Sequence, residues 1–326
     1  MKLIFLLSGE HPELAKEEVL GLLNSYGRIE RLDEDEQIMI ADFEGDMSAF
    51  DRLAFTHEIS EFFASCHLNE LEEVFREIPI PKGYTCVRVR KIGKGREHID
   101  SLEIERSMGA ILWKRGAKIS VSKPEVIIRI YLAERAHVGF LIHKTDTRQF
   151  NERRPDRRPF FMPFVVLPRL ARALINVTGV KEIMLDPMCG TGTFLIEAGL
   201  MGIKFAGIDV LRKVVFGCAK NLKFFGLPTN VIWGDARNVP FKDESFEAVV
   251  TDFPYLRSAR SYGDDLYERA TEEIWRVLKT GCRTVLVINV DADDIFGRFF
   301  RIEAKFYQRV HKSLTRRFFI CRKVQG

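Results

Sequence analysis

The chain has 326 residues, of which 46% are hydrophobic and 29% charged, so it can form a core and is long enough for two or three domains. Its apolar runs are too short to cross a bilayer, and its start is typical of a strand leading into a helix, so we expect a cytoplasmic protein. The six cysteines have neither zinc-site nor disulfide-framework spacing, and we expect no metal site.

Charge is distributed unevenly along the chain. Residues 1–80 contain 6 basic and 19 acidic residues, a net charge of −13, whereas residues 81–326 carry +17. This asymmetry indicates that the later part of the chain contacts a polyanion. The alternative is ordinary solvated charge on helix faces, which charge alone does not exclude.

The N-terminal pattern predicts a small α/β unit over residues 1–55. It begins with a strand at 2–7, followed by a helix from Pro12 to about residue 23. A second strand is expected at 37–43. Residues 46–66 carry apolar side chains at helical spacing and are therefore predicted to be helical.

Residues 56–143 predict a second α/β module with basic edges. Residues 85–90 alternate as a half-buried strand does, and 101–113 have the pattern of a helix closed by Gly116. Further strands are expected at 119–122, 125–133 and 136–142.

Residues 144–159 form a polar stretch without hydrophobic periodicity, which is typical of a linker. Five of them are arginines. We consider two interpretations, a solvated hinge and a strap that contacts phosphates.

From residue 160 onward the pattern alternates between strands and helices. Such alternation predicts a parallel sheet covered on both faces, and therefore an α/β fold. The tail, 301–310 and 315–324, predicts a hairpin that adds a reversed edge strand. The expected strands are 183–186, 205–209, 231–234, 248–251 and 284–289, and the expected helices are 168–176, 193–201, 212–225 and 266–279.

A glycine turn follows the first of these strands. The strand ends at Asp186, and Gly190 and Gly192 follow before the next helix. Glycine at this position lets the backbone approach a ligand without a clash from a Cβ atom. A single Gly-x-Gly is nevertheless a weak signal by itself.

Two further acids make the pattern more specific. Asp209 ends the second strand, where an acid can accept hydrogen bonds from ribose hydroxyls. Asp235 ends the third strand beside Ala236 and is expected to face an adenine amino group. A dinucleotide fingerprint would require a third glycine and space for a pyrophosphate. Acids instead favour the sulfonium and ammonium groups of S-adenosylmethionine, which we predict as the cofactor.

The fourth strand ends in Asp252-Phe253-Pro254-Tyr255, which predicts a site for methyl transfer to a planar amine. Such an amine is a poor nucleophile because its lone pair is delocalised into the ring. Asp252 is expected to accept its hydrogen bond and its proton. Pro254 fixes the loop, and Tyr255 is expected to stack on the base.

Three stretches together resemble the tRNA guanosine-10 N2-methyltransferases of archaea and eukaryotes. They are RRPDRRPFFMPFVVLPRLARALINVTG, LDPMCGTGTFLIEAGLMG and TDFPYLRSAR. The resemblance implies a Rossmann-like class I methyltransferase domain at 160–326, with a mostly parallel seven-stranded sheet. It implies a ferredoxin-like domain at 1–55, a THUMP RNA-binding domain at 56–143 and a linker at 144–159. It also implies that Phe160, Phe161 and Pro163 line the cofactor pocket.

The same resemblance implies tRNA as a partner and, in some members, a small zinc-ribbon activator subunit that covers a hydrophobic face. Apolar segments at 285–290, 296–300 and 318–319 are candidates for that face. Phe253 departs from the family pattern, which usually has proline at this position.

Three functions are compatible with these features. The first is methylation of N2 of guanosine 10 in tRNA, once or twice. The second is the same chemistry on another tRNA guanosine, on rRNA, on adenine N6 or on a glutamine amide, because the Asp252 motif alone does not distinguish planar amines. The third is an RNA-binding scaffold without turnover, for which Phe253 is the only support.

Overall fold

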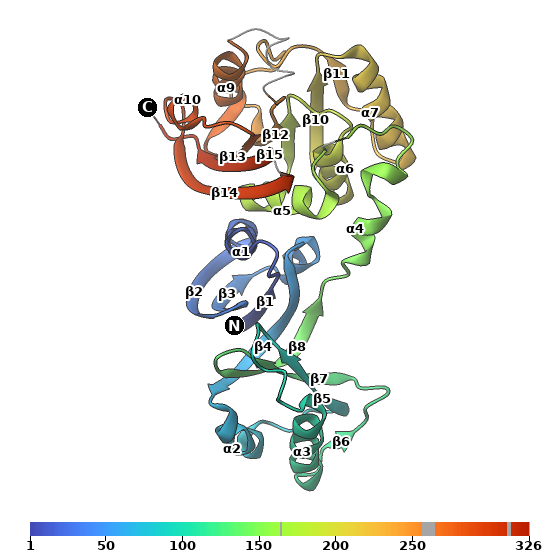
Figure 1. Cartoon of the computed structure of the whole chain (residues 1–326), viewed down its shortest axis with the longest axis vertical. Coiled ribbons are helices and arrows are strands. Elements are labelled where there is room, and N and C mark those ends of the chain that lie inside the picture. The colour runs from blue at the N-terminus through green and yellow to red at the C-terminus, as the bar shows by residue number, and fades with distance from the viewer. Residues whose placement is uncertain (164, 256–264, 312–313, 326) are drawn as a thin grey trace. The chain divides into compact units, whose positions relative to one another are not determined.

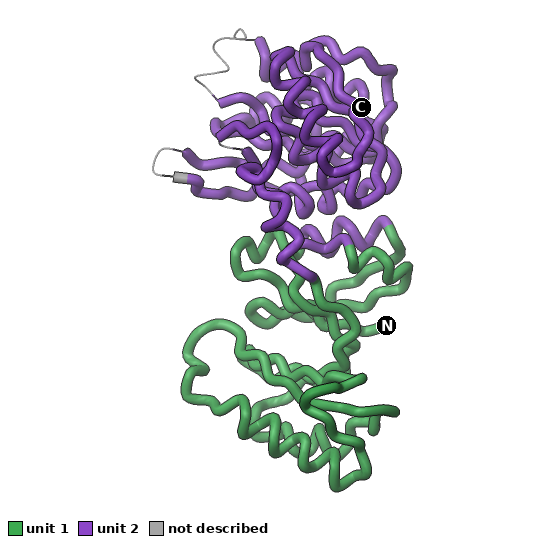
Figure 2. The backbone as a smooth tube through the Cα atoms, turned by 90° about the vertical axis from the view of Figure 1, so that its right-hand side faces the viewer, with its two compact units in different colours: residues 1–16, 26–51, 55–145 green, residues 17–25, 52–54, 146–326 purple. Residues whose placement is uncertain are grey.

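A computed structural model of the chain describes residues 1–163, 165–255, 265–311 and 314–325. Phe164 and the Leu256–Arg260 end of the third quoted stretch therefore lie outside the described residues. The chain folds into two compact units, the first comprising residues 1–16, 26–51 and 55–145 and the second residues 17–25, 52–54 and 146–326 (Figure 2).

The first unit is built on one eight-stranded sheet in the order β2-β3-β1-β4-β8-β7-β5-β6 (Figure 1). The elements of residues 1–145 are β1 (Lys2–Leu7), α1 (Pro12–Tyr26), β2 (Gly27–Asp35), β3 (Ile38–Gly45), η1 (Met47–Arg52), β4 (Thr56–Cys66), η2 (Leu68–Glu70), α2 (Leu71–Glu77), β5 (Tyr84–Lys91), α3 (Ser101–Lys114), β6 (Lys118–Ile119), β7 (Val126–Leu132) and β8 (Ala136–Lys144). Residues 17–25 of α1 and residue 52 of η1 are assigned to the second unit.

The helix predicted over residues 46–66 is wrong. Only Met47–Arg52 is helical, as a short 3-10 turn, and Thr56–Cys66 forms strand β4. β4 pairs with β1 on one side and with β8 on the other. Pairing with two partners distant in sequence outweighs the local helical spacing. Strands from both expected N-terminal domains thus share one sheet, and the boundary at residue 55 stays a prediction.

The second unit contains a seven-stranded sheet in the order β11-β10-β9-β12-β13-β15-β14. Its elements are α4 (Arg148–Glu152), η3 (Pro155–Arg157), α5 (Pro168–Thr178), β9 (Ile183–Asp186), α6 (Thr193–Leu200), β10 (Lys204–Asp209), α7 (Arg212–Phe224), β11 (Val231–Trp233), β12 (Phe246–Asp252), α9 (Leu266–Val277), β13 (Leu278–Ile288), α10 (Asp293–Phe296), β14 (Arg301–His311) and β15 (Leu314–Arg322).

The predicted α/β class and mostly parallel sheet are confirmed. β9 to β13 run parallel, and β15 is antiparallel to β13. The reversed strand is not at the edge, however, because β14 lies outside it. The β14–β15 hairpin packs into the hydrophobic core of this unit, where the ring centroids of Phe296 and Phe319 lie 5.0 Å apart.

Residues 144–159 are not a featureless linker, since they form α4 and η3. Two of their five arginines are buried. Arg153 forms two hydrogen bonds to the carboxylate of Glu197, at 2.7 and 3.0 Å, and Arg158 donates to Thr193 Oγ1 at 2.8 Å. Burial lowers the pKa of Arg158 to about 10. These two arginines anchor the segment to α6, which accounts for them without a phosphate contact.

Candidate active site

Four acidic residues lie at one edge of the second sheet. Asp186, Asp209 and Asp252 end the parallel strands β9, β10 and β12, and Asp235 follows β11. Because parallel strands have their carboxyl ends at the same edge, side chains distant in sequence meet there. The expected clustering of these acids follows from this topology.

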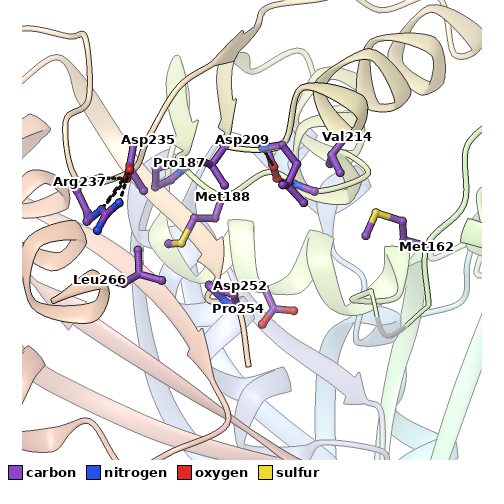
Figure 3. Close-up of a pocket in the computed structure, with 14 residues that line it drawn as sticks. Met162, Pro187, Met188, Asp209, Val214, Asp235, Arg237, Asp252, Pro254 and Leu266 are labelled. Atoms are coloured by element: carbon purple, nitrogen blue, oxygen red, sulfur yellow. Dashed lines mark hydrogen bonds and ion pairs between the residues drawn. The ribbon is translucent and has the colours of Figure 1, made fainter. Parts of the chain in front are cut away.

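Two neighbouring cavities open at this edge, and Figure 3 shows the residues that line the larger one. The larger, of about 260 Å³, is lined by Met162, Pro187, Met188, Gly190, Asp209, Val210, Leu211, Val214, Asp235, Ala236, Arg237, Asp252, Pro254 and Leu266. The smaller, of about 110 Å³, includes Asp186, Thr191 and the start of α6. Met188, Gly190 and Asp252 line both. The two cavities therefore form one continuous site, with Asp252 at the junction.

The glycine turn leaves space for a ligand at Gly190 and serves packing at Gly192. Gly190 has φ +50°, and a Cβ atom placed on it would meet no described residue within 4 Å. Its N–H donates to Asp209 Oδ2 at 3.0 Å. A Cβ atom on Gly192 would instead lie 2.6 Å from Cys218 Sγ. Gly190 is thus the glycine that leaves the cavity open, and Gly192 allows α6 and α7 to approach.

Asp186 is almost fully buried beneath the smaller cavity. Its Oδ1 accepts hydrogen bonds from Thr251 Oγ1 at 2.7 Å and from the Met188 N–H at 3.2 Å. Burial raises the pKa of this carboxyl to about 8. Asp186 is therefore largely protonated at neutral pH, and a cation in the cavity would favour its ionised form.

Asp209 and Asp235 occupy different electrostatic environments. Burial raises the pKa of Asp209, which accepts from the N–H groups of Gly190 and Leu211. Hydrogen bonds from Arg237 lower the pKa of Asp235. Arg237 Nη2 lies 2.7 Å from Asp235 Oδ2, and Nη1 donates to Asp265 at 3.0 Å (Figure 3). The adenine-facing role expected of Asp235 thus involves a carboxylate already held by Arg237.

Of the two carboxylate oxygens of Asp252, one has partners among the described residues and the other has none. Tyr255 donates to its Oδ2 at 3.4 Å, and Arg316 Nε lies 3.9 Å from the same atom. The other oxygen, Oδ1, is buried without a hydrogen-bond partner among the described residues. Burial raises the pKa of Asp252 to about 7. Oδ1 is an acceptor that a bound amine can satisfy.

Phe253 serves the core. Its ring is buried and packs against Phe296 and Tyr267, with centroids at 5.8 and 5.6 Å. Its N–H donates to the Val287 carbonyl at 2.8 Å. Tyr267 Oη also donates to the Pro254 carbonyl at 2.9 Å. The loop is therefore held by packing and hydrogen bonds at the position where proline was expected.

Of the segment expected to line the pocket, only Met162 does so. The Phe160 ring would meet a Cβ atom on Gly217 at 2.1 Å, and its backbone pairs with Asn221. Phe161 is 54% exposed and Pro163 is exposed. None of Phe160, Phe161 and Pro163 contributes to the two cavities. Phe160 anchors the segment to α7, and Met162 lines the larger cavity on the same side of the view as Val214 (Figure 3).

Sequence reasoning missed the residues that reach this site from outside the two motifs. They include Met162, Arg237 and Leu266 in the cavity wall and Arg316 beside Tyr255. Only Arg237 had a local signal, as a base two residues after a strand-end acid. Among the described residues, no helix is both long and apolar enough to cross a membrane, and no group of three or more His, Cys, Asp or Glu side chains could hold a metal ion.

Comparison with known proteins gives matches to methyltransferases over the whole chain. Residues 155–317 match the family described as RMKL-like, methyltransferase domain. The chain is 34% identical over 319 residues to the tRNA (guanine(10)-N2)-dimethyltransferase of Pyrococcus abyssi, covering 95% of this chain and 96% of that protein. The Methanothermobacter thermautotrophicus protein of the same name is 34% identical, with coverage of 97% and 98%.

A solved structure is similar in fold over nearly the whole length. The crystal structure of TrmN from Thermus thermophilus aligns with 99% of this chain and all of that chain. The TM-score is 0.53 at 20% identity.

Proposed function

Because the chain belongs to the tRNA (guanine(10)-N2)-dimethyltransferase family, we propose that it methylates the exocyclic N2 of guanosine 10 in tRNA, with S-adenosylmethionine as donor. The observation that carries this proposal is Asp252. Its Oδ1 atom is buried and has no partner among the described residues, and the residue itself lines both cavities.

The residues present fit the cofactor. The larger cavity takes the nucleoside, with Asp209 for the ribose and Asp235 and Ala236 at the adenine. The smaller cavity takes the methionine end, beside Asp186 and the N-terminus of α6. The apolar side chains of Met162 and Leu266 in the larger cavity suit a flat base.

Asp252, Pro254 and Tyr255 serve the acceptor. When bound, the cofactor supplies a methyl group on a positively charged sulfur. Asp252 Oδ1 accepts a hydrogen bond from the guanine amine and orients its lone pair. It would then take up the proton that the amine loses as the N–C bond forms and the methyl–sulfur bond breaks. The Tyr255 ring provides a surface against which a base taken out of its stack can lie.

Residues 56–143 serve tRNA binding in this proposal. A groove of about 460 Å³ runs along α3, lined by side chains that include Arg88, Arg106 and Trp113. Trp113 is 67% exposed. Cationic side chains beside an exposed ring suit an RNA strand, because phosphates and bases are then contacted together.

A zinc-ribbon activator subunit would dock on a different face from the one expected. Segments 285–290, 296–300 and 318–319 do not form that face, because Val285, Phe296 and Phe319 are buried. Edge strand β11 and helix α7 instead expose Phe216, Phe224 and Trp233, each to 58% or more. An open strand edge flanked by aromatic rings suits an added strand and an apolar contact.

The activity is tested with the purified protein, S-adenosylmethionine and a tRNA transcript, followed by nucleoside mass spectrometry. We expect N2-methylguanosine or N2,N2-dimethylguanosine at position 10, and no product from a transcript that carries adenosine in place of this guanosine. Methyl groups on another guanosine, or on adenine N6, would contradict the proposed target. Absence of transfer with and without a zinc-ribbon subunit would contradict the enzyme assignment.

The docking face is tested separately by mixing the protein with the zinc-ribbon subunit of the same organism. Trp233→Glu should abolish co-elution, whereas Trp113→Glu, on the other unit, should not. Co-elution that survives both Trp233→Glu and Phe216→Glu would exclude this face.

A further inference from the structure

One arginine reaches the catalytic motif from a distant part of the chain. Arg316 lies near the start of β15, which is antiparallel to β13. A reversed strand has its amino end where the parallel strands have their carboxyl ends. Val287 is the pairing partner of Asp252 on one side and of Phe318 on the other. The topology therefore places Arg316 at the same edge of the sheet as Asp252.

Two consecutive hydrogen bonds connect Arg316 to Asp252 through Tyr255. Its Nε donates to Tyr255 Oη at 2.7 Å, and Tyr255 in turn donates to Asp252 Oδ2 at 3.4 Å. A guanidinium has only donors, so the Tyr255 oxygen must accept from it. Among the described residues, the hydroxyl hydrogen is then donated to Asp252. The direction of both hydrogen bonds follows from the chemistry of arginine.

The guanidinium is also a fixed charge close to the carboxylate. Arg316 is only 4% exposed, and its Nε lies 3.9 Å from Asp252 Oδ2. Charges at this distance interact more strongly when they are shielded from water. The cation favours the ionised form of Asp252, whereas burial disfavours it.

We propose that Arg316 is a positioning residue for methyl transfer: it holds Tyr255 against Asp252 Oδ2, leaves Oδ1 for the amine, and favours the ionised form of the carboxylate. The inference deepens the proposed function and rests on it. Arg316 acts through Tyr255 and Asp252, and it lines neither cavity. Among the described residues, three ionisable groups interact with Asp252: Arg316 from β15, Tyr255 from its own loop, and Asp186 from β9, on whose carboxyl Asp252 exerts a charge effect.

The test is the pH dependence of kcat/KM for Arg316→Gln. Loss of a cation near a carboxylate should move the acid limb upward by about one pH unit. kcat should fall about tenfold or more, while the Kd for S-adenosylmethionine, measured by calorimetry, stays within about twofold. Arg316→Lys should return the acid limb toward the wild-type position, because the charge is kept, but should not fully restore kcat.

Arg317→Gln is the matched control. Arg317 is the next residue of β15, points to the opposite side of the sheet and pairs with Asp291 at 3.0 Å. Its replacement should keep the wild-type profile. An Arg316→Gln variant that is active with an unmoved acid limb would overturn the role of Arg316 while leaving the proposed function intact.

Two further outcomes also bear on the role of Arg316. If Arg316→Gln no longer binds cofactor, the role of Arg316 is tested with Arg316→Lys instead. An unchanged kcat in Arg316→Lys would overturn the proposal. A wild-type protein that binds cofactor but methylates no tRNA would contradict the proposed function and the role of Arg316 together.

Discussion

Thr251 and Asp186, at the ends of neighbouring strands β12 and β9, share a buried hydrogen bond of 2.7 Å between the threonine hydroxyl and the Asp186 carboxyl. Thr251 immediately precedes Asp252, so this bond joins Asp186, at the smaller cavity, to strand β12 beside Asp252. It links the two sequence motifs before any ligand is bound.

Thr251→Val should weaken cofactor binding. Valine keeps the shape of the side chain but removes the hydroxyl that donates to Asp186 Oδ1. The buried carboxyl then lacks one hydrogen bond, at a cost of about 1–3 kcal/mol. Calorimetry should show a Kd for S-adenosylmethionine raised roughly tenfold or more. Thr284→Val is the control, since Thr284 is also buried and donates to the Val249 carbonyl at 2.7 Å, outside both cavities. Equal cofactor affinity in the two variants would contradict the role of Thr251.

Cofactor binding should release a proton at neutral pH. Burial raises the pKa of Asp186 to about 8, and the cationic cofactor should favour ionisation. Titrations at pH 7 in buffers of different ionisation enthalpy should reveal release of close to one proton. Asp186→Asn should abolish it. Proton uptake would contradict the assignment of Asp186 to the cationic end.

The same raised pKa should make the cofactor-free protein less stable as pH rises. Folded Asp186 retains its proton up to a pKa of about 8, whereas an unfolded aspartate ionises near its ordinary pKa of 3.8. Unfolding therefore releases a proton between these values, and this contribution to stability is lost as pH rises through that window. Thermal denaturation between pH 5 and 8 tests this: the Tm of the wild type should fall with rising pH more than the Tm of Asp186→Asn does. This difference in pH dependence should become smaller when cofactor is added.

The rate should rise with pH through about 7. Burial raises the pKa of Asp252 to about 7, and only the ionised carboxylate can take up the proton of the amine. Asp252→Asn should lower kcat by about 10²–10⁴-fold with little change in cofactor affinity. Single-turnover rates and calorimetry separate the two effects. Undiminished activity of Asp252→Asn would show that another group takes the proton.

Gly190→Ala should weaken cofactor binding beyond its effect on stability. Its methyl group would project into the cavity, where no described residue lies within 4 Å. Gly202→Ala is the matched control, because Gly202 also has a positive φ, +77°, and open space around its Cβ position, but lies outside both cavities. Both should cost roughly 1–2 kcal/mol in backbone strain. Only Gly190→Ala should raise the Kd for S-adenosylmethionine.

Phe253→Pro should destabilise the protein although it restores the family residue. Proline removes the N–H that donates to Val287 and the ring that packs on Phe296. The lost ring alone should cost about 3–5 kcal/mol, which thermal denaturation would detect. If Phe253→Pro is instead stable and active, the loop tolerates either residue.

The sequence by itself determined the features carried by neighbours along the chain. Strand-end acids, the glycine turn and Asp252-Phe253-Pro254-Tyr255 each lie within a few residues, and parallel topology brings them together. These were enough to predict the α/β fold and the cofactor. The pattern failed at Thr56–Cys66, where strand pairing outweighed local helical spacing.

Only the tertiary structure decided which side chains complete the site. Arg316 lies 64 residues after Asp252 and meets it because a reversed strand returns to the same edge. Met162 rather than Phe160 enters the cavity because Phe160 is held against Gly217. Phe253 departs from the motif because its ring fills the core. Such long-range packing leaves no periodic or local signal in a sequence, whereas strand-end chemistry does.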